Sequence, residues 1–201
     1  GSGIVLINMD SALSTKNVYD VSGTSLATLQ SNTVTYQGDY VGDFTVAESN
    51  VSVENWTNFD TTFTMSFWLY TTDYHNSTST LLYTSDLYNS PNQGFMYQFI
   101  NQNELNLLFR GATDLSYNIS GTVSLTNKWS HHVITYDGTT IKLYLDNVSK
   151  GTFTANAPLS SGQTIYFMKG YSYSESDIRD AYGYLDDIRI YDYVLDPQEV
   201  E

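Results

Sequence analysis

Cysteine is missing from this 201-residue sequence, and basic residues are scarce. The absence of Cys excludes a disulfide framework, a thiolate metal site and a cysteine nucleophile. Eight Lys and Arg stand against 22 Asp and Glu, which gives a formal net charge of −14. A surface of this charge would repel a nucleic-acid backbone, so we expect no nucleic-acid partner. The same carboxylates would attract calcium, which prefers oxygen ligands.

Long hydrophobic runs are also missing. No apolar stretch approaches the roughly 18 residues of a transmembrane helix, so we expect no membrane insertion. The opening GSGIVLINMD lacks the basic region that begins a signal peptide. Residues 1–3 resemble a cloning scar, and we expect residues 4–201 to form one domain excised from a larger protein. A chain of this length suits a single all-β domain.

The residues that are abundant favour β-structure. Aromatic residues make up 15% of the chain, with 18 Tyr and 9 Phe, and they fit a pleated, half-buried surface. Residues 63–70 alternate between two faces, which predicts a strand with Phe63, Met65, Phe67 and Leu69 on one side and Thr64, Ser66, Trp68 and Tyr70 on the other. Similar patterns predict strands within residues 94–100, 104–111, 129–138, 140–147 and 162–170. No long segment keeps a helical period, so we expect only short helical turns.

Two turn signals lie close together in the last third of the chain. Asp137-Gly138 and Asp146-Asn147 supply residues that tolerate the positive φ of tight turns. The stretch TYDGTTIKLYLDNVSKGTF, residues 135–153, therefore predicts a three-stranded meander.

Two stretches carry a resemblance to a known family. KWSHHVITYDGTTIKLYLDNVSKG, residues 128–151, is followed by YGYLDDIRIYDYVLDPQEV, residues 182–200. In their order and spacing they resemble the laminin G-like group of concanavalin A-like jelly rolls, which share a Trp-x-His strand, a Tyr-Asp-Gly turn and a closing strand with two Asp residues. The resemblance implies an all-β fold, a two-sheet antiparallel jelly-roll sandwich.

The closing strand contains two adjacent carboxylates. Strict alternation predicts one face with Tyr184, Asp186, Ile188 and Ile190, and an opposite face with Leu185, Asp187, Arg189 and Tyr191. On that pattern Asp187 pairs with Arg189 at the surface. Asp186 would face the core, where a carboxylate needs hydrogen bonds, a cation or a proton.

The family resemblance implies a cation for Asp186. Many such domains hold a structural calcium near the junction of the first and last strands, and Asp10 and Asp186 match the acidic positions of those strands. The loop donors that would complete the sphere are Gly38, Asp39 and Asp43. The alternative is that Asp186 accepts backbone N–H bonds with no metal present.

Polar loops rich in tyrosine are the candidates for ligand binding. Sugar rings stack on aromatic side chains while their hydroxyl groups need polar partners. Three loops supply such residues, namely Tyr74, His75, Asn76, Tyr88, Asn89, Asn92, Tyr171 and Tyr173. The simpler alternative is that a Tyr-rich chain exposes many tyrosines without a role, and that His75 is a solvated loop residue.

An enzymatic role finds little support in the sequence. Some concanavalin A-like proteins are glycoside hydrolases with a Glu-x-Asp-x-x-Glu strand, but the nearest match, Glu175, Asp177 and Asp180, ends in Asp and has the composition of a loop. Retaining hydrolysis needs two carboxylates held about 5 to 5.5 Å apart. His131 and His132 are adjacent on a strand, so they face opposite sides and cannot share a metal. We expect no catalysis.

The leading hypothesis is a non-catalytic, calcium-stabilised carbohydrate-binding or adhesion module of a larger secreted, cell-surface or virion-surface protein. Its partner would be a glycan or a cell-surface glycoconjugate. The alternative is a structural or protein-binding domain that binds no sugar. At the chain end, LDPQEV has the pattern of a capping box, with Asp196 as the N-cap and Glu199 three residues later.

Overall fold

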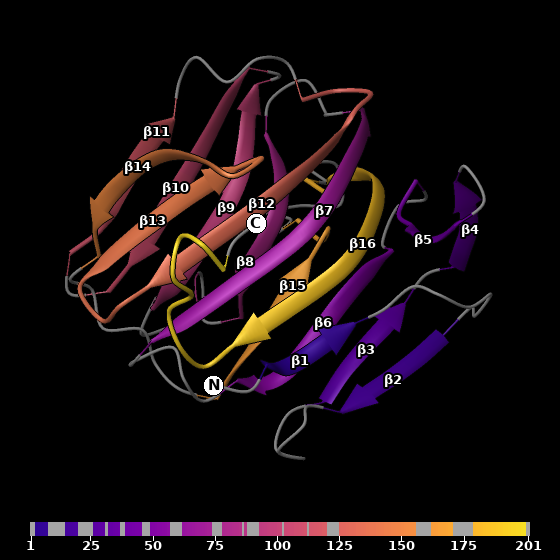
Figure 1. The fold of residues 1–201 in the computed structure, drawn as a ribbon, viewed down its shortest axis with the longest axis horizontal. Coiled ribbons are helices and arrows are strands. Elements are labelled where there is room, and N and C mark those ends of the chain that lie inside the picture. Colours follow the sequence, from indigo (N-terminus) through magenta and orange to yellow (C-terminus); the bar gives the residue numbers. More distant parts are fainter. Residues whose placement is uncertain are drawn as a thin grey trace.

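A computed structural model describes residues 3–7, 15–19, 26–30, 32–36, 39–45, 49–56, 62–73, 78–85, 87, 93–101, 103–111, 113–119, 125–155, 162–170 and 179–199. These residues form two antiparallel sheets and no helix (Figure 1). The described part of the chain thus has no helical segment that could cross a membrane. The prediction of an all-β, two-sheet sandwich is confirmed.

Each sheet contains eight of the described strands. The order of the first is β14 (Val148–Thr154), β13 (Thr140–Leu145), β12 (Trp129–Tyr136), β7 (Phe63–Asp73), β16 (Tyr182–Tyr191), β5 (Asp39–Asp43) and β4 (Asn32–Tyr36), with β1 (Gly3–Ile7) also paired to β16. The order of the second is β11 (Leu115–Ile119), β10 (Glu104–Arg110), β9 (Gly94–Asn101), β8 (Ser79–Thr84), β15 (Gln163–Phe167), β6 (Asn50–Trp56), β3 (Leu26–Gln30) and β2 (Thr15–Tyr19). The first and last strands of the chain therefore lie side by side.

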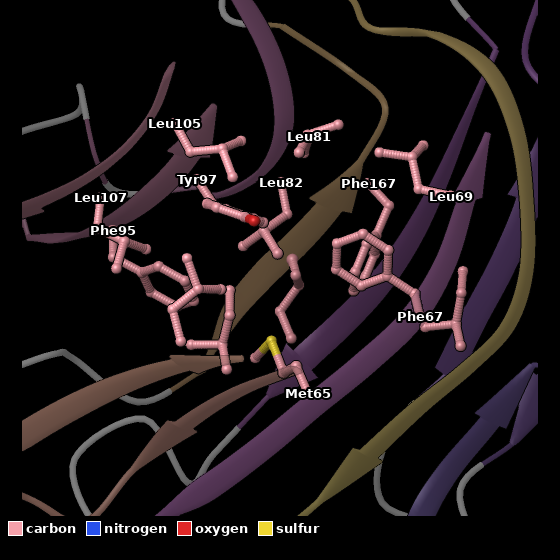
Figure 2. Packing of buried hydrophobic residues seen from close by; sticks show 14 of the residues in the cluster. Met65, Phe67, Leu69, Leu81, Leu82, Phe95, Tyr97, Leu105, Leu107 and Phe167 are labelled. Atoms are coloured by element: carbon pink, nitrogen blue, oxygen red, sulfur yellow. The ribbon is translucent and has the colours of Figure 1, made fainter. Parts of the chain in front are cut away.

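The core lies between the two sheets. The predicted alternation of β7 is confirmed, because Phe63, Met65, Phe67 and Leu69 are each at most 1% exposed. Figure 2 shows Phe67 of β7 beside Phe167 of β15, and their rings meet edge to face with centroids 5.7 Å apart. Aromatic contacts of this kind add to the gain from burial and hold the two sheets together.

The predicted meander is formed by β12, β13 and β14. In its first turn the Asp137 carboxylate accepts hydrogen bonds from the amides of Thr140 (2.7 Å) and Thr139 (2.9 Å). These bonds hold the pKa of Asp137 well below its usual range. In the second turn Asp146 and Asn147 have φ values of 47° and 64°, as a two-residue hairpin turn requires.

The predicted alternation of the closing strand is wrong beyond Asp186. In β16, Asp186 lies opposite Trp68 and Arg189 lies opposite Ser66, so two residues of β16 oppose one residue of β7. This is a β-bulge, and Asp187 takes a φ of 52° within it. The extra residue shifts the alternation by one position, so the residues that face the core are Leu185, Ile188 and Ile190, each 0% exposed. Asp186 shares the outer face with Trp68 instead of the core face with Ile188.

The terminal segment folds back onto the outer face of β7. The amide of Leu195 donates to the Thr64 hydroxyl at 3.0 Å. The predicted capping-box bonds are present, since the Asp196 amide donates to Glu199 Oε2 at 2.9 Å and Asp196 Oδ1 accepts from the amide of Gln198 at 2.9 Å. They close a turn and not a helix. The turn holds Leu195 and Glu199 beside the sheet.

Candidate functional site

A cleft of about 350 Å³ lies on the outer face of the first sheet, over β12, β7 and β16, which run side by side in Figure 1. Its floor consists of outward-facing strand residues: Ser66, Trp68, His131, Val133, Arg189 and Tyr191. Its walls come from the bulge, the β13–β14 turn and the terminal turn: Asp187, Asp146, Asn147, Leu195 and Glu199. The cleft thus combines an open sheet face with three rigid turns.

Aromatic rings form the centre of the floor. Trp68 and His131 lie directly opposite each other on β7 and β12, and their rings stack with centroids 4.8 Å apart and an interplanar angle of 25°. Trp68 is 39% exposed, which is unusual for so large an apolar side chain. Burial lowers the pKa of His131 below its usual value, and this effect outweighs the opposite pull of Asp146 and Asp187. His131 is therefore neutral at pH 7.

The bulge places a charged pair at the edge of this floor. Arg189 Nη2 lies 3.0 Å from Asp187 Oδ2, and Arg189 Nε donates to Asp187 Oδ1 at 3.3 Å. A hydrogen bond with Tyr191, together with this ion pair, raises the pKa of Arg189 above its usual value. The predicted pairing of Asp187 with Arg189 is confirmed, and its two-point geometry holds the guanidinium in a fixed plane.

Two further carboxylates are oriented by backbone amides. Asp146 Oδ1 accepts a hydrogen bond from the amide of His131 at 2.8 Å, and Glu199 Oε2 accepts one from the amide of Asp196 at 2.9 Å. Each carboxylate has a second oxygen with no hydrogen bond in the described part of the chain. An exposed aromatic surface surrounded by fixed polar groups is suited to stacking and hydrogen bonding with a polar ring.

The neighbouring histidine on β12 lies in the core, so the two histidines face opposite sides of the strand, as the alternation predicts. His132 is 0% exposed, and its ring lies between two hydroxyl groups, with Tyr97 Oη 2.7 Å from Nδ1 and Ser130 Oγ 2.7 Å from Nε2. Burial lowers the pKa of His132 to about 3 and raises that of Tyr97 well above its usual value. This network is closed to solvent, so it is structural and cannot serve as a catalytic serine and base.

The loop residues proposed to bind ligand lie outside the described residues: Tyr74, His75, Asn76, Tyr88, Asn89, Asn92, Tyr171 and Tyr173. Two of the three loops are flanked by residues in contact, because the amide of Thr80 donates to the Arg179 carbonyl at 2.8 Å and Thr80 forms a bridge with Asp180. The third loop connects the end of β8 to the start of β9. It therefore leaves β8 at the end away from Thr80. The assignment of these eight residues stays a prediction.

The calcium donors named from the sequence are described only in part. Asp10 and Gly38 lie outside the described residues, and Asp39 is described by its backbone, paired with Tyr36. Asp43 lies opposite Tyr184, so Asp43 and Asp186 share the outer face. Among the described residues no group of three or more His, Asp or Glu could hold a metal ion.

Both described carboxylates also accept hydrogen bonds. Asp43 Oδ1 accepts from the amide of Thr45 at 3.0 Å and from its hydroxyl at 2.6 Å. Asp186 Oδ1 accepts from the amide of Asp187 at 2.9 Å. Carboxylate oxygens are ligands that calcium prefers. The hydrogen bond from the Asp187 amide also fits the alternative, in which Asp186 accepts backbone N–H groups and binds no metal.

Trp68, His131, Asp146 and Glu199 of the cleft were not predicted as functional residues. One signal was present, because the alternation of β7 already places Trp68 on the polar face of its strand. The pairing of β7 with β12, which brings His131 to Trp68, depends on contacts between distant segments. No local pattern contains that pairing.

Comparison with known proteins agrees with this architecture. The family model described as concanavalin A-like lectin/glucanases superfamily matches residues 43–201. No curated protein sequence matches the chain. Domain 4 of AbnA, a GH43 extracellular arabinanase from Geobacillus stearothermophilus solved in complex with arabinotriose, has a TM-score of 0.65 at 15% identity, covering 96% of this chain and 91% of that one.

Botulinum neurotoxin binding domains have the same fold. The domain of serotype D/C VPI 5993 has a TM-score of 0.71 at 18% identity, covering 99% of this chain and 50% of that one. A structure of type C, whose cell entry depends on interaction with two ganglioside molecules, has a TM-score of 0.64 at 17% identity, covering 90% and 46%. This chain therefore spans about half the length of these toxin domains. The match over residues 43–201, together with the two-sheet architecture, shows that the chain belongs to the concanavalin A-like lectin/glucanases superfamily.

Proposed function

We propose that the chain is a non-catalytic carbohydrate-binding module that holds a glycan in the cleft over β12, β7 and β16. The observation that carries the proposal is the exposed ring of Trp68, stacked on His131 among side chains that the fold holds in place. The arabinanase domain solved in complex with arabinotriose supports it, because it has the same fold over nearly its whole length. The type C toxin, whose cell entry depends on interaction with two ganglioside molecules, shares the fold over about half of its binding domain. A secreted or surface location, in a larger protein, accords with these relatives.

Binding would follow from the chemistry of the floor and walls. The C–H face of a sugar ring stacks on the exposed face of Trp68, which removes apolar surface from water. Hydroxyl groups of the sugar donate to the second oxygens of Asp146 and Glu199 and accept from the Arg189 guanidinium. Because backbone amides and Asp187 already orient these groups, little side-chain freedom is lost on binding.

The same contacts argue for binding and against glycosidic cleavage. In the cleft, Asp187 is neutralised by Arg189, and the other two carboxylates each hold a backbone amide. A glycosidase needs a proton donor whose pKa is raised by a nonpolar environment, opposite a second carboxylate. A paired carboxylate such as Asp187 does not meet that need.

Replacing Trp68 with alanine is expected to weaken glycan binding by about tenfold or more, the loss of one aromatic stacking contact. The measurement is a glycan array of wild type and variant, followed by titration with the strongest neutral oligosaccharide. Folding should be little affected, because Trp68 is partly exposed and its removal leaves no core cavity.

The control is Tyr166→Ala. Tyr166 stacks on Tyr83 at 5.1 Å on the outer face of the second sheet, so its loss should leave binding unchanged. If Tyr166→Ala abolishes binding and Trp68→Ala does not, the ligand binds the other sheet. If wild type binds no glycan on the array, the chain is a structural or protein-binding domain instead.

We also propose a structural calcium ion, with Asp43 and Asp186 as its described ligands and Asp10, Gly38 and Asp39 as the others. Calcium would neutralise carboxylates on neighbouring strands and so hold β5 and β16 together. It should raise the melting temperature, by the equivalent of about 2.7 kcal/mol at 100 times its dissociation constant, since it binds only the folded state. Melting would be followed in EDTA and then in excess calcium.

Asp186→Asn is the control for this experiment. It keeps the shape and the acceptor for the Asp187 amide but removes one charge, so calcium should no longer raise its melting temperature. Equal melting temperatures of wild type with and without calcium would leave the alternative, in which Asp186 serves only as a hydrogen-bond acceptor.

A further inference from the structure

The cleft carries an excess of negative charge. Its described lining contains three carboxylates, Asp146, Asp187 and Glu199, and one guanidinium, Arg189. His131 adds no positive charge at pH 7, because burial keeps its imidazole neutral. Two negative charges are therefore left uncompensated in the described cleft, within a chain whose net charge is −14.

The guanidinium in this lining is already engaged. Two of its nitrogens bond to Asp187, Nη2 at 3.0 Å and Nε at 3.3 Å. A ligand carboxylate would have to compete with Asp187 for Arg189. It would also lie close to the carboxylates on both walls, Asp146 and Glu199.

The hydroxyl groups of a ligand are attracted by the same carboxylates that repel a ligand carboxylate. A sugar hydroxyl donates to a carboxylate oxygen, and charge-assisted bonds of this kind are stronger than neutral ones. The second oxygens of Asp146 and Glu199 are acceptors only. The walls of the cleft thus suit hydroxyl donors and repel anions.

We infer that the cleft selects uncharged glycans and rejects sugars that carry a carboxylate or a sulfate. The inference rests on the proposed function and specifies its class of ligand. Selection operates through repulsion of the wrong ligand as much as through attraction of the right one. The repulsion comes from the two walls and from the charge of the whole molecule.

The experiment uses matched pairs of oligosaccharides, each a neutral chain and the same chain with a terminal sialic acid. Wild type should bind the neutral member at least about tenfold more tightly at about 0.1 M salt, where the Debye length is about 10 Å. The preference should shrink at about 1 M salt, where that length is about 3 Å. A preference that does not change with salt would show a steric and not an electrostatic origin, and would overturn the inference.

Asp187→Asn tests the role of the paired guanidinium. The variant removes one negative charge and releases Arg189, so the affinity for the sialylated member should rise by about tenfold. Asn is suited to the positive φ of 52° at this position. Glu199→Gln removes a wall charge independently and should shift the preference in the same direction. A melting curve of each variant confirms that it is folded.

Asp114→Asn is the matched control. It makes the same change in charge beside Arg110, 3.8 Å away, in the connection between β10 and β11 on the other sheet, so the preference should not change. Equal or tighter binding of the sialylated member by wild type would overturn the inference and leave the carbohydrate-binding function standing. Binding of neither member would count against the proposed function itself.

Discussion

Replacing Gly183 with alanine is expected to lower the free energy of unfolding by about 3 kcal/mol or more. Gly183 lies in β16 with a φ of 154°, a conformation that L side chains rarely adopt. A Cβ atom there would collide with the Tyr70 carbonyl oxygen and would come within 2.9 Å of its carbon. These are backbone atoms of the neighbouring strand, so no side-chain rotation relieves the contact.

The collision cannot be avoided by a shift of β16 alone. On its other side Gly183 exchanges backbone hydrogen bonds with Phe44, at 2.8 and 3.4 Å, and Phe44 is 0% exposed. Moving β16 away from β7 would therefore press it against β5. The same displacement would move Arg189 and Asp187, so binding in the cleft should weaken together with stability.

Chemical denaturation of wild type and variant measures this effect. Gly162→Ala is the control, because Gly162 also has a positive φ of 79° but a Cβ atom there would meet nothing within 4 Å. Its cost should be about 1 kcal/mol, from the backbone conformation alone. Equal losses in the two variants would show that the backbone contact with Tyr70 does not decide the stability of this strand.

Acid is expected to destabilise the protein through His132 before most carboxylates titrate. The folded pKa of His132 is about 3, whereas an unfolded histidine titrates near 6.5. Between these values the unfolded chain binds a proton that the folded chain does not, so stability is complete above about pH 6.5 and falls as the pH falls. The slope is about 1.4 kcal/mol per pH unit, which gives a loss of roughly 3 kcal/mol by pH 4.5.

The physical cause is the lack of room for a charge in the core. His132 is 0% exposed and its ring stacks on Phe67 at 5.1 Å. The Ser130 hydroxyl donates to the Leu69 carbonyl at 3.4 Å, so it accepts a hydrogen bond from Nε2–H of the His132 ring. In this neutral tautomer Nδ1 accepts from the Tyr97 hydroxyl. Protonation of Nδ1 would remove the acceptor that Tyr97 uses and place an unpaired cation among apolar side chains.

Urea unfolding between pH 7 and pH 4.5 tests this expectation. His132→Gln should flatten the dependence on pH even if it lowers the overall stability, whereas His131→Gln should keep most of it, because His131 lies half-buried on the outer face. NMR titration of the two rings gives a second measurement. A His132 ring that becomes charged near pH 6 in the folded protein would contradict the expectation.

The sequence was sufficient to predict the parts of the fold that depend on local pattern. The alternation of β7, the turns at Asp137 and Asp146 and the capping-box bonds of Asp196 and Glu199 each follow from residues close together in the chain. The two-sheet architecture followed from the resemblance that these patterns carried. A local sequence pattern predicts structure well where the contacts that it requires are made by residues close together in the chain.

The cleft could not be predicted in this way. It depends on the register that places His131 opposite Trp68 and on the bulge at Asp187, and both are set by pairing between distant strands. Nothing in LDDIRI shows that one residue is extra, because the bulge is defined only by the pairing of β16 with β7. The assignment of Asp186 to the core was wrong for this reason.

The extra residue at Asp187 has a wider consequence for comparisons within the superfamily. If these same residues paired with β7 in unbroken register, without the bulge, Ile188 and Ile190 would face solvent and Arg189 and Tyr191 would turn inward, because side chains alternate with a period of two. Two relatives can therefore share every strand of this sandwich and still display different chemistry at this surface. Whether this strand forms the bulge decides which side chains a ligand meets, so specificity can change between relatives while the fold stays the same.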